Sequence, residues 1–92
     1  MTLPSTHIHP HSFLGRLFDR IDREITAMEH TDLSNTTIMF QHTSRIREMA
    51  QDLKQIELRF DSGSPQVVEI EAFLRRVYVR LDAFMYIAVQ MM

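Results

Sequence analysis

Apolar residues in the first third of the chain recur with the spacing of an amphipathic helix. Between residues 13 and 30 they lie alternately four and three residues apart, which keeps them on one face of a helix with about 3.6 residues per turn. These residues are Leu14, Phe18, Ile21, Ile25 and Met28. Ser12 precedes the run and can accept a hydrogen bond from a free first-turn amide, as N-cap residues do. The pattern predicts a helix over about residues 13–30.

A longer and more regular row covers about residues 35–60. Its members alternate between spacings of three and four residues, as in the heptad repeat of a coiled coil. They are Met39, His42, Ile46, Met49, Leu53, Ile56 and Phe60. For His42, the one histidine in the row, we expect a backbone carbonyl or a carboxylate from another helix as partner. The alternative is a polar residue that fixes register or senses pH.

The last segment, about residues 65–91, repeats this three-and-four spacing. Its row consists of Val67, Ile70, Leu74, Val77, Leu81, Phe84, Ala88 and Met91. Between the two rows lies the stretch DSGSP, in which Gly63 suits a left-handed backbone just past a helix. Ser64 can cap the next helix and Pro65 can occupy its first position. The connection is short, so helices 35–60 and 65–91 should lie antiparallel.

These three segments predict an all-α protein: a long antiparallel helical hairpin with coiled-coil-like packing, and an N-terminal helix packed against it. In the hairpin we expect Ile46, Met49, Leu53 and Ile56 to face Leu74, Val77 and Leu81. The chain has 92 residues, 45% of them hydrophobic and 24% charged, which is typical of one globular domain. We expect a flexible tail over residues 1–12 and a single helical domain over residues 13–92.

Charge and hydropathy exclude several classes of partner. The net charge is −2 and the signs are interspersed, which argues against a surface for nucleic acid. The longest apolar run, residues 83–89, is far shorter than the roughly 20 residues of a membrane span, and the start of the chain lacks the pattern of a signal peptide. We therefore expect a soluble protein without a membrane span or cleaved signal.

Alternating histidines in the tail raise the question of a metal site. His7, His9 and His11 could chelate a transition metal, but Pro10 restricts His9 to extended backbone, and no cysteine or nearby carboxylate completes the ligand shell. We expect at most adventitious nickel binding and predict no functional metal site.

The rest of the chain offers little for catalysis. Arg75, Arg76 and Arg80 could hold an anion, but nearby acidic residues favour ordinary surface pairing. The stretch LFDRIDREI is similar to the first helix of the small all-helical chorismate mutases, but no later set of active-site residues aligns, so we reject that interpretation. No nucleophile–base pair or phosphate loop is apparent. We predict a protein that is not an enzyme, without catalytic residues or cofactor.

The end of the chain, LDAFMYIAVQMM, is apolar on every face. From residue 83 onward Gln90 is the only strongly polar side chain. A small bundle buries one stripe of such a helix, and the remainder would form an exposed patch suited to a partner. We predict that the partner-binding residues are Phe84, Met85, Tyr86, Val89 and Met92. The alternatives are that the N-terminal helix covers this patch or that it inserts into a membrane surface.

These features favour a chaperone-like or adaptor-like subunit that binds a helical protein partner or forms a homo-oligomer. The heptad helix IREMAQDLKQIELRF, the turn SGSPQ and the apolar last helix resemble the small helical-hairpin components of bacterial type III secretion systems, which include needle-subunit chaperones and needle or inner-rod subunits. The resemblance covers about half of the chain. It implies a cytoplasmic protein that binds a secreted helical subunit and prevents its premature polymerisation, or else a subunit that itself polymerises.

A DNA-binding regulator is an alternative from another class. It would use the helix at 65–91 to read DNA, which requires an exposed basic face. Glu69, Glu71 and Asp82 flank the arginines of that helix and oppose this interpretation.

Overall fold

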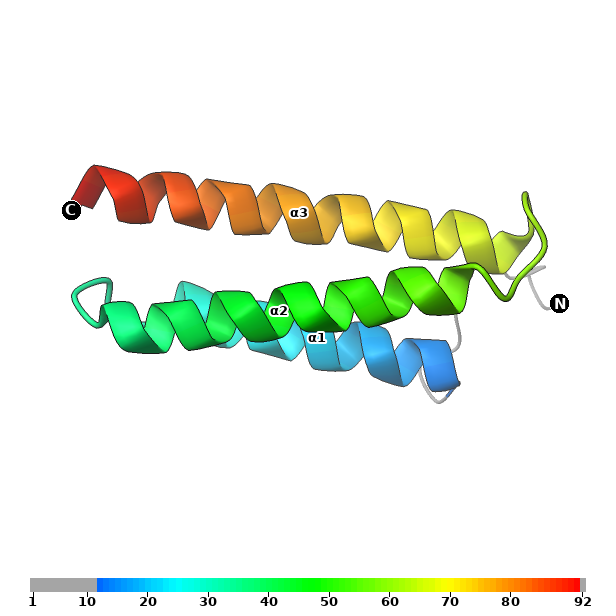
Figure 1. Ribbon diagram of the computed structural model, residues 1–92, viewed down its shortest axis with the longest axis horizontal. Coiled ribbons are helices and arrows are strands. Elements are labelled where there is room, and N and C mark those ends of the chain that lie inside the picture. The colour runs from blue at the N-terminus through cyan, green and yellow to red at the C-terminus, as the bar shows by residue number, and fades with distance from the viewer. Residues whose placement is uncertain (1–11, 92) are drawn as a thin grey trace, which may run out of the picture.

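The computed structural model describes residues 12–91, which form three α-helices: α1 (Phe13–Glu29), α2 (Thr36–Glu57) and α3 (Pro65–Met91). The helices α1 and α3 run in the same direction, and α2 lies antiparallel to both (Figure 1). The all-α fold with an antiparallel α2–α3 hairpin is thus confirmed. The closest pair, however, is α1 with α2. The tail histidines at positions 7, 9 and 11 lie outside the described residues. None of the three helices is long and apolar enough to cross a membrane.

Polar side chains cap the first two helices. The Gly15 amide donates to Oγ of Ser12 at 3.0 Å, which confirms the predicted N-cap of α1. The Ile38 amide donates to Oδ1 of Asn35 at 3.2 Å in the same manner. Each cap satisfies one of the amides that a helix N-terminus leaves without an intrahelical partner.

The turn between α2 and α3 is built as the sequence predicts, with one difference in its position. Gly63 has a φ of 82°, and the Ser64 amide donates to the Asp61 carbonyl at 3.0 Å, so Gly63 occupies the third position of a tight turn that requires positive φ. Ser64 then caps α3 by accepting from the Val67 amide at 3.3 Å, and Pro65 is the first helical residue. Because α2 ends at residue 57 rather than at 60, Gly63 belongs to this turn and not to the helix end.

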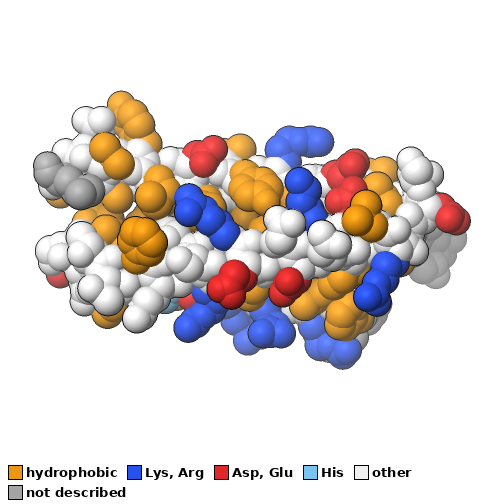
Figure 2. Space-filling view, viewed as in Figure 1, with side chains coloured by type: hydrophobic (Ala, Val, Ile, Leu, Met, Phe, Trp, Pro, Cys, Tyr) orange, Lys and Arg blue, Asp and Glu red, His pale blue; other side chains and the backbone are white. Residues whose placement is uncertain are grey.

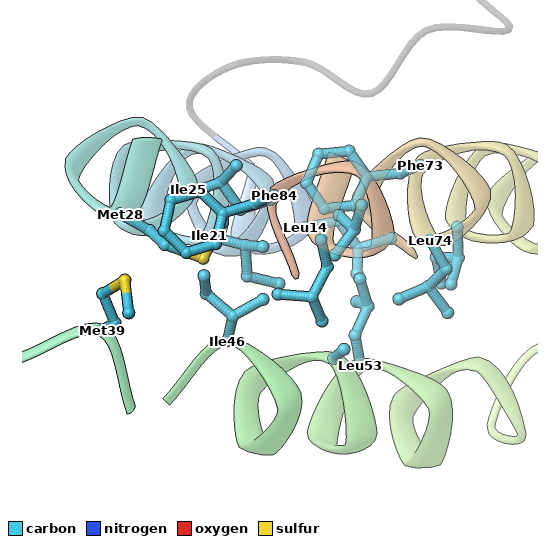
Figure 3. Packing of buried hydrophobic residues seen from close by; sticks show 14 of the residues in the cluster. Leu14, Ile21, Ile25, Met28, Met39, Ile46, Leu53, Phe73, Leu74 and Phe84 are labelled. Carbon is cyan, nitrogen blue, oxygen red and sulfur yellow. The ribbon is translucent and has the colours of Figure 1, made fainter. Parts of the chain in front are cut away.

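The core consists of one buried row from each helix (Figure 3). From α1 come Leu14, Ile21, Ile25 and Met28; from α2 come Met39, Thr43, Ile46, Ala50 and Leu53; from α3 come Val67, Ile70, Phe73, Leu74, Val77, Leu81, Phe84 and Ala88. In the close-up, Ile46 and Leu53 point from α2 towards the other two helices. The predicted row of α3 is therefore confirmed except for its last member, Met91.

The buried row of α2 differs from the predicted one. Thr43 and Ala50 are buried, whereas His42, Met49 and Ile56 are only half-buried. The expectation that Met49 faces α3 is wrong: it lines a small cavity together with residues of α1 and the neighbouring α2 positions 52 and 53. The reason is that α2 contacts two helices, so its buried surface is wider than one heptad row, and its centre lies between the α1 and α3 sides.

Candidate protein-interaction surface

The relative lengths of α1 and α3 leave the end of α3 without a helical neighbour on one side. Phe18 of α1 stacks on Phe73 of α3 with ring centroids 4.3 Å apart. The last residue of α1 is Glu29, and its Oε1 lies 2.6 Å from Nη2 of Arg80. The end of α1 therefore lies beside Arg80 of α3. Because α1 ends there, the last turns of α3 extend beyond the helical part of α1.

Exposed apolar side chains gather at this end of the bundle. We call the set the terminal patch: Tyr86, Ile87, Val89 and Met91 of α3, with Phe40 near the start of α2. Each is more than half exposed. Because α2 is antiparallel to α3, its first turns lie at the end where α3 finishes (Figure 1). Figure 2 shows hydrophobic side chains on both helices at this end. Residues 83–92 include no aspartate, glutamate, lysine or arginine, so the α3 part of the patch contains no charged side chain.

Of the predicted partner-binding residues that the structure describes, one is buried in the core, one is half-buried and two are exposed. Tyr86 and Val89 are 68% and 61% exposed, so α1 does not cover them, and the alternative that it would is wrong for these two residues. Phe84 is 7% exposed and belongs to the core, because it follows the buried row of α3; we correct its assignment to the surface. Met85 is half-buried and packs against the core. Met92 lies outside the described residues.

Three residues of the terminal patch did not appear in the prediction. Met91 continues the three-and-four spacing after Ala88 and was expected inside, but it is 69% exposed. Its position on the helix is inward, but α1 no longer runs beside this last turn. Ile87 lies next to the predicted positions and could have been found from the uniformly apolar composition there. Phe40 carries no sequence signal for this surface, because only the antiparallel arrangement brings the start of α2 to the end of α3.

A shallow, open groove follows the outer side of α2 next to Phe40. It is lined by Thr36, Thr37, Phe40, Gln41, Ser44, Arg45 and Glu48. The lining is mostly uncharged near Phe40 and charged further along the helix. The groove extends the terminal patch with hydroxyl and amide groups that could bond a partner's polar side chains.

A half-buried polar pair joins α1 to α2. Nδ1 of His42 lies 2.5 Å from Oε2 of Glu24, and Nη1 of Arg45 lies 3.4 Å from the other carboxylate oxygen. The side chains of His42 and Glu24 are only 20% and 15% exposed. The prediction that a carboxylate from another helix is the partner of His42 is therefore confirmed, and the pair satisfies polar groups that would otherwise be buried at a cost.

The three arginines of α3 differ in their contacts. Arg80 bonds Asp22 at 2.8 Å and Glu29 at 2.6 Å, and these bonds raise the pKa of its guanidinium, with Glu29 as the larger cause. Arg76 lies over the ring of Phe73. Arg75 has no ion-pair partner among the described residues, so the expected surface pairing holds for Arg80 alone.

Known proteins add no functional information. The chain matches no protein-family model, no curated protein and no solved structure. Within residues 12–91, no group of three or more metal-ligating side chains is placed to bind an ion. The arrangement defines a three-helix bundle with exposed apolar side chains at one end.

Proposed function

We propose that this protein is a non-enzymatic interaction subunit, chaperone-like or adaptor-like, that binds a helical protein partner through the terminal patch. One observation supports this most: five apolar side chains at one end of the bundle are each more than half exposed. Contiguous exposed apolar surface on a small protein is typical of an interaction site. Full burial of one fully exposed side chain of this kind is worth roughly 1.5–3 kcal/mol. A few such side chains commonly carry most of the binding energy of an interface.

A helical partner fits this surface better than an extended one. Tyr86 and Val89 lie three residues apart, and Ile87 and Met91 lie four apart, so both pairs form ridges along α3. The described residues contain no β-strand whose edge could accept an extended peptide. A partner helix could lie beside the end of α3 and contact Phe40 on α2.

The resemblance to type III secretion components suggests the class of partner. On that proposal the protein is cytoplasmic, and the partner is a secreted helical subunit whose own apolar face it covers before export. A subunit that itself polymerises is the alternative within the same class. The DNA-binding alternative can be tested by a mobility-shift assay at low salt, in which we expect no binding.

The terminal patch can be tested by a triple variant, Tyr86→Gln with Val89→Gln and Met91→Gln. These side chains are exposed, so the variant should keep its helical circular dichroism and melt close to the parent. It should lose, in pull-downs analysed by mass spectrometry, a partner that the parent retains. Met85 is left unchanged because it packs against the core.

The matched control removes exposed apolar surface at the opposite end of the bundle. Phe13 and Leu58 are 59% and 77% exposed, and Phe13→Gln with Leu58→Gln should leave the partner bound. If the triple variant folds and keeps every partner of the parent, the proposal is wrong. If both variants lose the partner equally, the terminal patch is not the specific site.

A further inference from the structure

The outer side of α3, opposite its buried row, carries a second regularly spaced row. Val79 is two residues from both Val77 and Leu81, and two residues turn a helix by about 200°, so Val79 points away from the core. From this position, steps of three and four residues define the outer row: Val68, Ala72, Arg75, Val79, Ala83, Tyr86 and Gln90. Its three larger apolar side chains are each more than half exposed. Because these side chains are exposed, no helix within residues 12–91 covers this side of α3.

Two opposite charges lie along one edge of the outer row. Arg75 and Asp82 are seven residues apart, which is about two helical turns, so they lie on the same side of α3. Both are exposed, and neither has an ion-pair partner or a side-chain hydrogen bond within the described part of the chain. They lie four residues before and three residues after Val79, the middle member of the row.

We propose that a second copy of this chain occupies the outer row, with the two α3 helices antiparallel about a two-fold axis near Val79. The two-fold axis of an antiparallel pair is perpendicular to the plane of the two helices and keeps the same edge of both helices on one side of the contact, so Arg75 of each copy faces Asp82 of the other. Two symmetric ion pairs then flank an apolar contact centred on the two Val79 side chains. The small residues Ala72 and Ala83 allow the helices to approach closely.

The charges favour the antiparallel over the parallel arrangement of the same two helices. In a parallel pair, whose two-fold axis runs along the helices, the edge with Arg75 and Asp82 would lie on opposite sides of the contact in the two copies, so neither ion pair would form. The antiparallel arrangement brings the opposite charges together in two attractive contacts. The charge pattern therefore favours a second copy in one orientation. An unrelated apolar partner would not require opposite charges on either side of Val79.

The size of the outer row sets the strength of the dimer. It spans residues 68–90, or about 33 Å at 1.5 Å per residue, and is one helix wide. A contact of this size buries less than the ~1,600 Å² of a standard interface. We therefore expect a reversible dimer with a micromolar dissociation constant.

Sedimentation equilibrium of the full chain, from low-micromolar to near-millimolar concentration, tests this dimer. The parent should shift from monomer to dimer within that range. Arg75→Glu places a negative charge against Asp82 of the other copy, and Asp82→Arg places a positive charge against Arg75. Each variant alone should bind itself roughly tenfold or more weakly than the parent does.

Mixing the two single variants gives the decisive result. In a dimer of one Arg75→Glu chain with one Asp82→Arg chain, both contacts are attractive again, so the mixture should dimerise about as well as the parent. The double variant Arg75→Glu with Asp82→Arg should likewise regain its homodimer. The control Glu48→Arg, an exposed charge reversal on α2, should dimerise like the parent.

Several outcomes would overturn the dimer: a parent that stays monomeric, single variants that dimerise like the parent, or a mixture that stays as weak as its components. Circular dichroism of each variant shows whether it is folded. The mixture contains only the two variants that are also measured alone, so a gain in dimerisation on mixing cannot come from a difference in folding. The dimer and the helical partner proposed above share Tyr86, but the tests of the dimer change only Arg75 and Asp82, which lie outside the terminal patch. A monomeric parent that still binds its partner rejects the dimer alone, whereas a parent that dimerises but shows no specific partner rejects only that proposed function.

Discussion

The two sides of α3 follow the same spacing rule but have different surroundings. Its inner row, which includes Leu74 and Val77, is buried against α1 and α2. Its outer row, which includes Val68 and Val79, repeats at three-and-four spacing and remains exposed. The comparison shows that periodicity identifies a face that can pack against a helix. It does not show whether that helix belongs to the same chain.

Residue size and charge separate the two rows where periodicity does not. The inner row is rich in large side chains such as Ile70 and Phe84, which fill the space between three helices. The outer row contains two alanines and, in line with them, Arg75. A row of this kind suits a close contact between two helices with charged edges, while it would fill a three-helix core poorly. The inner row should therefore determine stability and the outer row association.

The largest expected effect comes from the inner row. Leu74 is 5% exposed, and Leu74→Ala should lower the free energy of unfolding by about 2–5 kcal/mol, because it removes buried methyl groups and leaves a cavity. Urea unfolding monitored by circular dichroism measures this change. A variant with an unfolding midpoint equal to that of the parent would show that the inner row does not hold the bundle together.

A smaller effect is expected at the edge between the two rows, where Arg80 joins α3 to α1. Arg80→Met should lower stability by about 1 kcal/mol, since the bonds to Asp22 and Glu29 are lost at a partly exposed site. The loss should shrink in high salt. Arg75→Met is the matched control, because Arg75 has no ion-pair partner in the described chain. Equal losses for the two variants would contradict the role of the Arg80 bonds.

On the opposite edge of α3, Glu71 affects a carboxyl group of α2. Burial raises the pKa of Glu57 above its ordinary value of 4.5, and the nearby carboxyl of Glu71 adds to this effect. A raised pKa means that the folded protein favours the protonated form. This stabilising contribution is present below pH 4.5, the unfolded value, and is lost as the pH rises through the folded value.

Glu57→Gln should therefore raise stability slightly at neutral pH, by no more than a few tenths of a kcal/mol, because solvent screens the interaction at this partly exposed site. Below pH 4.5 the variant and the parent should differ little. Thermal melts of both proteins across this pH range measure the difference. A variant that is less stable than the parent at neutral pH would reverse the predicted sign.

Little effect on stability in either direction is expected from the outer row. Val79→Gln should change the free energy of unfolding by no more than about 0.5 kcal/mol at a concentration where the chain is monomeric, because the side chain is 63% exposed. A loss comparable to that of Leu74→Ala would mean that the two rows do not differ as described.

Much of the fold could be predicted because it depends on local interactions. The N-cap at Ser12 and the turn at Gly63 each depend on a few neighbouring residues, and both are confirmed. The burial of Thr43 and Ala50 was missed, because neither residue has a strong apolar signal and the centre of the buried face of α2 depends on where its two neighbours lie.

The terminal patch was predictable only in part. Tyr86 and Val89 were expected at the surface because a helix that is apolar on all sides cannot be buried all round in a small bundle. Met91 was expected inside, because sequence spacing gives its direction on the helix but not the point at which α1 ends. Phe40 could not be predicted, since it is separated from the end of α3 by more than forty residues along the chain.

The sequence by itself determined that this protein consists of three helices, where each begins, and which face of α3 is buried, since helical period and capping are local properties. The tertiary structure decided that α1 packs most closely on α2, that Glu24 is the partner of His42, and that Phe40 joins the apolar end of α3. These features depend on how each helix is rotated about its axis and on where neighbouring helices end relative to one another. Contacts between segments that are distant in the sequence set this arrangement, so a local sequence pattern does not reveal it.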